Sequence, residues 1–169
     1  MSFYIDFFKG SGTDDKGRTL EEILSFTDNE LERVHNYIQR IFPLNEKSYA
    51  DPTAPLLTEE DIEEFNLNPI IRDNIEVVFS RMLRFYGFKY IDSKIYLAEN
   101  FSERVSEWIT YRNHNYLRIT RIIKFLKLVS FDKEAEEFFN ILERIYSDKH
   151  LGKIIGENTY SYWMDAIEG

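Results

Sequence analysis

Apolar residues recur through most of the chain at the spacing of amphipathic helices. The clearest case is the segment 115–129, where six apolar side chains fall on one side of a helical wheel drawn at about 100° per residue. These residues are Tyr116, Ile119, Ile122, Ile123, Leu126 and Val129. We therefore predict a helix over residues 115–129 that turns this side toward a hydrophobic core.

Two capping boxes predict helix starts in the first third of the chain. In Thr19–Glu22 and Thr27–Glu30, a threonine and a glutamate are placed to satisfy the orphan amides of a helix start. The second box predicts a helix that continues to Phe42, because the residue before a proline disfavours helix and Pro43 follows. The apolar face of this helix would be Leu31, Val34, Ile38 and Ile41.

Proline positions and cap residues divide the middle of the chain. Residues 43–57 contain three of the four prolines and predict an irregular connection. A short acidic helix should follow from Thr58 to Phe65, and Asn68 before Pro69 is typical of an N-cap followed by proline at the first helical position. The helix that starts there should end at Gly87. Further helices are predicted at residues 102–111, 133–146 and 158–167.

One stretch alternates by twos instead. Residues 88–97, FKYIDSKIYL, alternate around a turn-like Asp92-Ser93 and predict a small β-hairpin. No Gly/Ser linker or low-complexity run divides the sequence, so we expect a single domain over residues 1–169. The predicted fold class is mainly α, an irregular multi-helix bundle with one small β-hairpin near residues 88–97.

Composition narrows the class of protein. The 169 residues are 43% hydrophobic and 16% aromatic, which is typical of a folded domain, and the net charge of −9 argues against nucleic acid or an anionic membrane as a general partner. The absence of cysteine excludes disulfides and thiolate metal sites. No apolar run approaches the roughly 20 residues that span a bilayer, and the N-terminal residues lack a signal-peptide pattern. We expect a soluble, cytoplasmic protein, and its oligomeric state stays open because the acidic surface could also mediate self-association.

Residues 112–128 contain five basic side chains and no acid. His114, Arg118 and Arg121 stand at i, i+4 and i+7, on the other side of the wheel from the apolar face. Such a row suits an anionic partner with a hydrophobic body. The alternative is internal charge pairing with the acids of residues 132–143, since a charge run is usually a solvated helix face.

Signals for catalysis or metal binding are weak. The three histidines have no second ligand at metal-binding spacing, and there is no nucleophile elbow. Glu99 and Glu103 could be paired carboxylates for acid–base chemistry, or surface acids that favour a helix start. We expect no cofactor and no metal ion.

Several sequence blocks occur in the order found in one known family. The segment from His114 to Ile122, HNYLRITRI, resembles the most recognisable motif of the opioid growth factor receptor conserved domain. The other matching blocks are Phe3-Tyr4, residues 35–39 with 41–44, Leu57-Thr58 with Ile62 and Phe65, Met82-Leu83 with residues 85–89, and residues 98–100 with Glu103-Arg104. The blocks extend from Phe3 to about Leu126, so the chain resembles a short, domain-only member of that family.

The resemblance implies a receptor-like, non-catalytic domain that binds a peptide or protein ligand, since animal members are described as receptors for enkephalin-type opioid peptides. The ligand-binding residues of this hypothesis are Glu99, Asn100, His114, Tyr116, Arg118, Arg121, Tyr37 and Trp108. Glu99 would bind a peptide ammonium, and Arg118 with Arg121 its carboxylate.

Two other interpretations stay open. In the first, the same blocks form the core, with Arg118 and Glu99 as a buried pair. In the second, the protein is an enzyme that acts on a small anionic substrate through His114, Arg118, Arg121 and Glu99.

Overall fold

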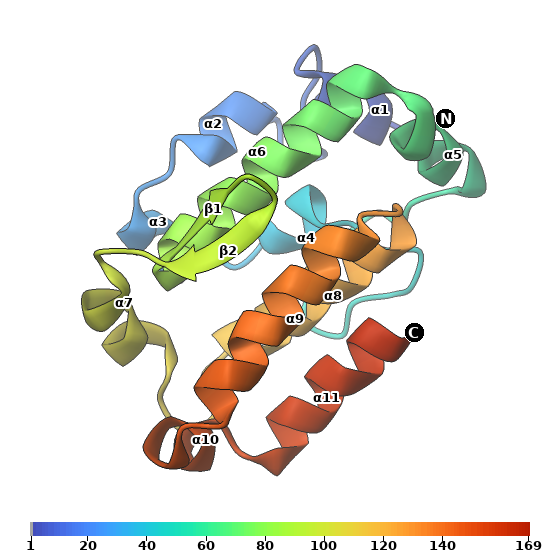
Figure 1. Cartoon of the computed structure of the whole chain (residues 1–169). Helices are drawn as coiled ribbons and strands as arrows, with labels where there is room; N and C mark the ends of the chain where they lie inside the picture. Colours follow the sequence, from blue (N-terminus) through green and yellow to red (C-terminus); the bar gives the residue numbers. More distant parts are fainter. Residues whose placement is uncertain (1) are drawn as a thin grey trace. The chain divides into compact units, whose positions relative to one another are not determined.

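Eleven helices and one two-stranded antiparallel sheet form the described part of the chain, residues 2–169 of the computed structural model (Figure 1). The predicted mainly α class with a small hairpin is confirmed. The chain divides into two compact units, Met1–Arg81 and Met82–Gly169, and helix α6 (Pro69–Tyr86) runs through the division. The expectation of a single domain stays a prediction.

The first unit contains five complete helices and the beginning of α6. They are α1 (Tyr4–Lys9), α2 (Leu20–Leu24), α3 (Asp28–Arg33), α4 (Ile38–Ile41) and α5 (Glu59–Leu67). The capping boxes at Thr27 and Thr58 are complete, and Asn68 Oδ1 accepts hydrogen bonds from the amides of Ile70 and Ile71 at 3.0 and 3.2 Å. Helix α1 was not predicted, because its aromatic run has neither a capping box nor helical periodicity long enough to identify.

The predicted continuous helix from Thr27 to Phe42 is wrong. Helix α3 ends at Arg33, Val34 is extended (φ −81°, ψ 130°), and a separate short helix begins at Ile38. The break frees the carbonyl of Asn36 from helical hydrogen bonding, and this carbonyl accepts hydrogen bonds from Arg18 Nη2 at 3.2 Å and Arg40 Nη1 at 3.1 Å. Two arginines thus stabilise an interruption that apolar periodicity does not reveal. The predicted end before Pro43 is confirmed.

Arg40 is the largest charged side chain in the core of the first unit. Its side chain is fully buried, and its guanidinium binds both carboxylate oxygens of Asp15 at 2.8 and 3.0 Å and also pairs with Asp51. Burial by itself would lower the pKa of Arg40, but the hydrogen bonds to the two carboxylates outweigh burial and raise it. Arg40 therefore ties the loop after α1, the α3–α4 break and the proline-rich connection together.

The second unit begins with the hairpin of β1 (Phe88–Ile91) and β2 (Lys94–Leu97). Asp92 and Ser93 both have positive φ, at 51° and 66°, as a two-residue hairpin turn requires. Gly87 ends α6 at φ 92°, where an added Cβ would lie 2.7 Å from Phe101 Cα. The predicted hairpin and the glycine stop are confirmed.

Five helices follow: α7 (Phe101–Trp108), α8 (Asn115–Leu128), α9 (Asp132–Tyr146), α10 (Lys149–Ile155) and α11 (Glu157–Glu168). Helices α8, α9 and α11 pack side by side (Figure 1), and the predicted apolar face of α8 is buried throughout. Helix α7 ends at Trp108, three residues before its predicted end. Helix α10 was missed because two glycines, Gly152 and Gly156, interrupt a short apolar pattern.

We predict that the variant Arg40→Met destabilises the chain by about 3 kcal/mol. This is the lower end of the range for opening a buried ion pair, because Asp15 and Asp51 keep partial access to water. Urea unfolding at neutral pH measures the change. The matched control is Lys47→Met, which removes the same charge from an exposed side chain and should change the unfolding free energy by less than about 0.5 kcal/mol. Equal losses in the two variants would contradict the role of Arg40.

The contribution of Arg40 should depend on pH. The pKa of Asp15 is lowered from its ordinary 3.8, chiefly by the hydrogen bond from Arg40, and that of Asp51 is lowered by Thr53 and then by Arg40. Below the ordinary pKa, the unfolded chain takes up protons before the folded chain does, so stability is lost as the pH falls. The free-energy difference between wild type and Arg40→Met should be constant above about pH 5 and shrink as the pH falls below 3.8. Unfolding curves at several pH values test this, and a difference that grows in acid would contradict it.

Candidate functional site

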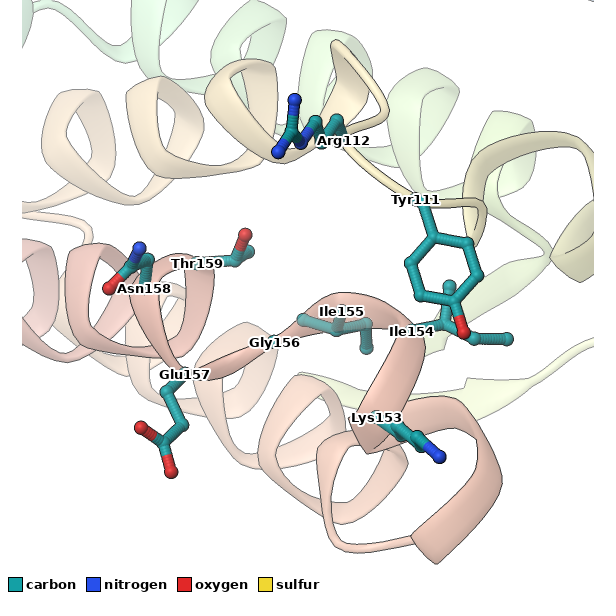
Figure 2. Close-up of a pocket in the computed structure, with 9 residues that line it drawn as sticks. All are labelled: Tyr111, Arg112, Lys153, Ile154, Ile155, Gly156, Glu157, Asn158 and Thr159. Carbon is teal, nitrogen blue, oxygen red and sulfur yellow. The ribbon is translucent and has the colours of Figure 1, made fainter.

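Two adjoining hollows lie between the α7–α8 loop and the start of α11. The first, which we call the tyrosine hollow, has a volume of about 340 Å³ and is lined by Arg112, His114, Tyr116, Leu117, Thr159 and Tyr162. The second, the arginine–lysine hollow, has a volume of about 430 Å³, and its lining includes Tyr111, Arg112, Lys153, Ile154, Glu157 and Thr159 (Figure 2). Arg112 and Thr159 line both hollows, so the two are neighbours.

Tyr116 forms a rigid wall of the tyrosine hollow. Its hydroxyl donates a 2.7 Å hydrogen bond to the carbonyl of Thr110, and its ring packs edge-on against Trp163, with centroids 6.1 Å apart. Trp163 Nε1 in turn donates to the carbonyl of Tyr116 at 3.2 Å. Burial raises the pKa of Tyr116 to about 12. The α7–α8 loop, α8 and α11 are all fixed to this one residue.

Hydrogen bonds of Asn113 order the backbone of the α7–α8 loop, which contains no glycine or proline. Asn113 Nδ2 donates to Glu107 O at 3.2 Å and to Thr110 Oγ1 at 3.0 Å, while Asn113 Oδ1 accepts from the amide of Asn115 at 2.9 Å. Arg112, just before it, has φ 56°, which is unusual for a residue with a side chain. The hydrogen bonds of Asn113 therefore fix the loop, and the side chain of Arg112 is exposed.

Exposed apolar side chains surround the two hollows. Tyr111, Leu117 and Tyr162 are 69%, 64% and 55% exposed. Exposed apolar groups that gather beside a concavity are typical of binding surfaces, whereas scattered ones are normal in any soluble protein. The arrangement offers apolar contact together with the basic groups of Arg112 and Lys153.

Two predicted ligand-binding residues, His114 and Tyr116, line the tyrosine hollow. The basic row that was expected to join them does not form a single outer face. Arg118 is only 6% exposed and its Nη1 lies 3.4 Å from Asn115 Oδ1, which also accepts from the hydroxyl of Tyr86 at 3.2 Å. Arg121 is half-buried, and His114, Arg118 and Arg121 each have further interactions within the fold. The wheel placed Arg118 on the side away from the core, and this was wrong because polar Asn115 and Tyr86 extend the buried region around it.

The other predicted site residues lie elsewhere. Trp108 is fully buried and donates from Nε1 to the carbonyl of Tyr86 at 3.0 Å. Tyr37 belongs to the first unit, where it is buried and donates to Leu31 O at 2.7 Å. Asn100 is at the start of α7, and its Nδ2 donates to Arg84 O at 3.3 Å. Trp108 and Tyr37 are core residues in this geometry, and the binding roles suggested for these three side chains stay predictions.

Glu99 is not the buried partner of Arg118. Its side chain is 88% exposed and pairs with Lys89 at 3.2 Å, and the pKa of Glu99 is lowered by a backbone hydrogen bond and by that lysine. The interpretation of Arg118 and Glu99 as a buried pair is therefore wrong. The suggested pairing of the α8 basic residues with the acids of α9 does occur at Lys127 and Asp132, 3.8 Å apart.

Sequence reasoning missed Tyr111, Arg112, Lys153 and Tyr162 as lining residues. Arg112 was recognised as part of the basic segment, but the helical wheel assigned no role to a residue before the helix. Lys153 was not placed because α10 was not predicted. The sequence contained one signal for this site, the basic Arg112 next to the aromatic Tyr111 in the loop before the HNY segment. What brings it beside α11 is tertiary packing, which the sequence pattern does not reveal.

Other kinds of site are not evident in the described structure. Among residues 2–169, no three His, Asp or Glu side chains gather as they would around a metal ion. No described helix is both long and apolar enough to cross a membrane. Of the described residues that line the two hollows, Glu157 alone carries a carboxylate, so these hollows do not offer a carboxylate pair for acid–base chemistry.

Comparison with known proteins identifies related sequences. A family model described as the opioid growth factor receptor (OGFr) conserved region matches residues 1–168. The opioid growth factor receptor of Homo sapiens is 37% identical over 160 residues, covering 89% of this chain and 23% of the relative. Opioid growth factor receptor-like protein 1 of Mus musculus is 36% identical over 115 residues, covering 65% of this chain and 24% of the relative. The chain thus spans about a quarter or less of the curated relatives' length. No solved structure matches it.

We predict that two aromatic residues of the second unit respond very differently to truncation. Trp108→Ala should cost about 3–5 kcal/mol, because it empties a fully buried site, whereas Tyr162→Ala at the rim of the tyrosine hollow should cost less than about 1 kcal/mol. Thermal and urea unfolding measure both changes. A large loss in Tyr162→Ala would assign that side chain to packing rather than to a binding surface.

Proposed function

The chain belongs to the opioid growth factor receptor family, and we propose that it recognises a peptide segment, free or displayed on a protein, without converting it chemically. The main observation that supports this proposal is the pair of adjoining hollows, where exposed cations lie next to exposed aromatic and aliphatic side chains. A peptide offers the matching groups, because its side chains bury apolar area while its backbone and charged groups form hydrogen bonds and ion pairs.

The tyrosine hollow suits a peptide side chain. Its volume of about 340 Å³ falls in the range of roughly 300–1,000 Å³ typical of ligand pockets. Tyr116 gives it a wall that does not need to move on binding, since its hydroxyl and carbonyl are both engaged in hydrogen bonds. A preformed wall reduces the entropy cost of association. Tyr162 and Leu117 at the rim provide the apolar area that binding would bury.

The names of the relatives agree with this function. Both relatives described above are named as opioid growth factor receptors or as similar to them, and a receptor binds a ligand. Since this chain covers only a fraction of each relative, the activity of the whole relative does not transfer automatically. No observation in the described structure favours the alternative of an enzyme that uses His114, Arg118, Arg121 and Glu99, because Glu99 is paired with Lys89 and Arg118 is buried.

We predict that the chain retains specific sequences from a randomised library of five-residue peptides. The chain is immobilised, the retained peptides are sequenced, and the strongest is titrated by calorimetry, with an opioid peptide tested in parallel. We expect saturable binding of one peptide per chain. Tyr162→Ala should weaken it about tenfold, which corresponds to a loss of about 1.4 kcal/mol, because the variant removes the aromatic area that binding would bury. Tyr49→Ala is the control, because Tyr49 is fully exposed and belongs to the other unit.

The outcomes separate the candidate sites. Retention of no sequence above background would overturn the proposal. If Tyr162→Ala binds like wild type while Arg121→Ala does not, the ligand uses the basic row of α8 predicted from the sequence, and the hollows are the wrong site.

A further inference from the structure

We propose that the arginine–lysine hollow binds the free C-terminal carboxylate of the recognised peptide, so that the ligand is a peptide end and not an internal segment. This inference rests on the proposed function and narrows it to one ligand chemistry. The last side chain of the peptide would contact the apolar lining, and the preceding residue would reach the tyrosine hollow.

The first observation is a pair of cations without internal partners. Arg112 comes from the α7–α8 loop and Lys153 from α10, on opposite sides of the hollow, and Figure 2 shows their charged ends pointing away from each other. In the described part of the chain, neither side chain forms a hydrogen bond or an ion pair. An arginine can bind a carboxylate through two parallel hydrogen bonds, and a lysine adds a mobile charge from the other side. Arg112, which has a positive φ, lines both hollows.

The second observation concerns the acids that could oppose an anion. Glu157 is the carboxylate of the lining, and Figure 2 shows it pointing away from Arg112. Residues 82–169 hold thirteen basic and thirteen acidic side chains, so the net charge of −9 falls entirely on residues 1–81. An anion that enters the hollow therefore does not meet a net negative charge on its own unit.

The backbone at the start of α11 adds to this field without being the basis of the inference. Its N-cap is Gly156, which supplies no side chain to accept from the first-turn amides. Such amides carry partial positive charge and favour anions nearby. They lie in the segment that lines the hollow together with Thr159.

The apolar part of the lining favours the end of a peptide over a small inorganic anion as the ligand. Tyr111, Ile154 and Ile155 provide an apolar wall, and a hollow of about 430 Å³ is much larger than one carboxylate requires. The shared residues Arg112 and Thr159 connect it to the tyrosine hollow. With two cations and one acid in the lining, the charge matches a monoanionic carboxylate better than a phosphate dianion.

The main experiment compares two forms of the strongest library peptide, one ending in a carboxylate and the other in a carboxamide. We expect the carboxamide form to bind the whole chain about tenfold more weakly, as for the loss of a charge-assisted hydrogen bond. Arg112→Gln and Lys153→Gln should each weaken binding of the carboxylate form more than binding of the carboxamide form. Lys149→Gln is the matched control, because Lys149 is exposed on the same helix as Lys153 but does not line the hollow.

A second measurement does not depend on the library. In the isotopically labelled whole chain, N-acetylleucine should shift the amide signals of Glu157, Asn158 and Thr159 at millimolar concentration, whereas N-acetylleucinamide should not. Arg112→Gln should abolish the shift. Inorganic phosphate is titrated in parallel, and shifts with phosphate but not with N-acetylleucine would assign the hollow to phosphate and overturn the inference.

The results separate this inference from the proposed function. If the carboxylate and carboxamide peptides bind equally well, peptide recognition stands and the terminal-carboxylate inference falls. If no peptide binds, both fall, whatever the small probes show.

Discussion

The placement of Tyr116 is the constraint on which the candidate site depends. Its hydroxyl holds the carbonyl of Thr110 in the loop before α8, and its carbonyl accepts from Trp163 in the middle of α11. Because one residue fixes both neighbours, the loop and the start of α11 face each other across a defined space. Together with the hydrogen bonds of Asn113, these two bonds fix the loop in which Arg112 has a positive φ.

In the first unit, a buried charged residue holds the irregular segments in place. A fully buried guanidinium at Arg40 binds Asp15, Asp51 and the carbonyl of Asn36, and these partners come from segments with little regular structure. Short helices bury too little apolar area to hold long connections in place, so polar anchors take over part of that role. In both units, the irregular segments are fixed by side chains that hydrogen-bond to backbone carbonyls.

Much of the fold could be predicted from the sequence, and most of the site could not. Local signals identified the capping box at Thr27, the helix start at Thr58, the Asn68 cap, the hairpin turn and the apolar face of α8, because each depends on residues close together in the chain. The break after Arg33 was missed because it is stabilised by Arg18 and Arg40, whose roles arise from tertiary contacts. For the same reason, periodicity placed Arg118 on an outer face, although Asn115 and Tyr86 bury it. Of the hollow lining, His114 and Tyr116 were found through the HNY motif, while Lys153 lies on a helix too short and glycine-rich to predict.

The net charge is distributed unevenly between the two units. The acidic unit affects repulsion between copies of the chain, and the neutral unit affects which ligand binds. An excess of negative charge on residues 1–81 promotes mutual repulsion between copies of the chain, which opposes aggregation. Residues 82–169 have no net charge, so the selectivity of this unit for a charged ligand depends on the positions of individual cations. Changes in ionic strength would therefore alter the colloidal behaviour of the protein mainly through its N-terminal half.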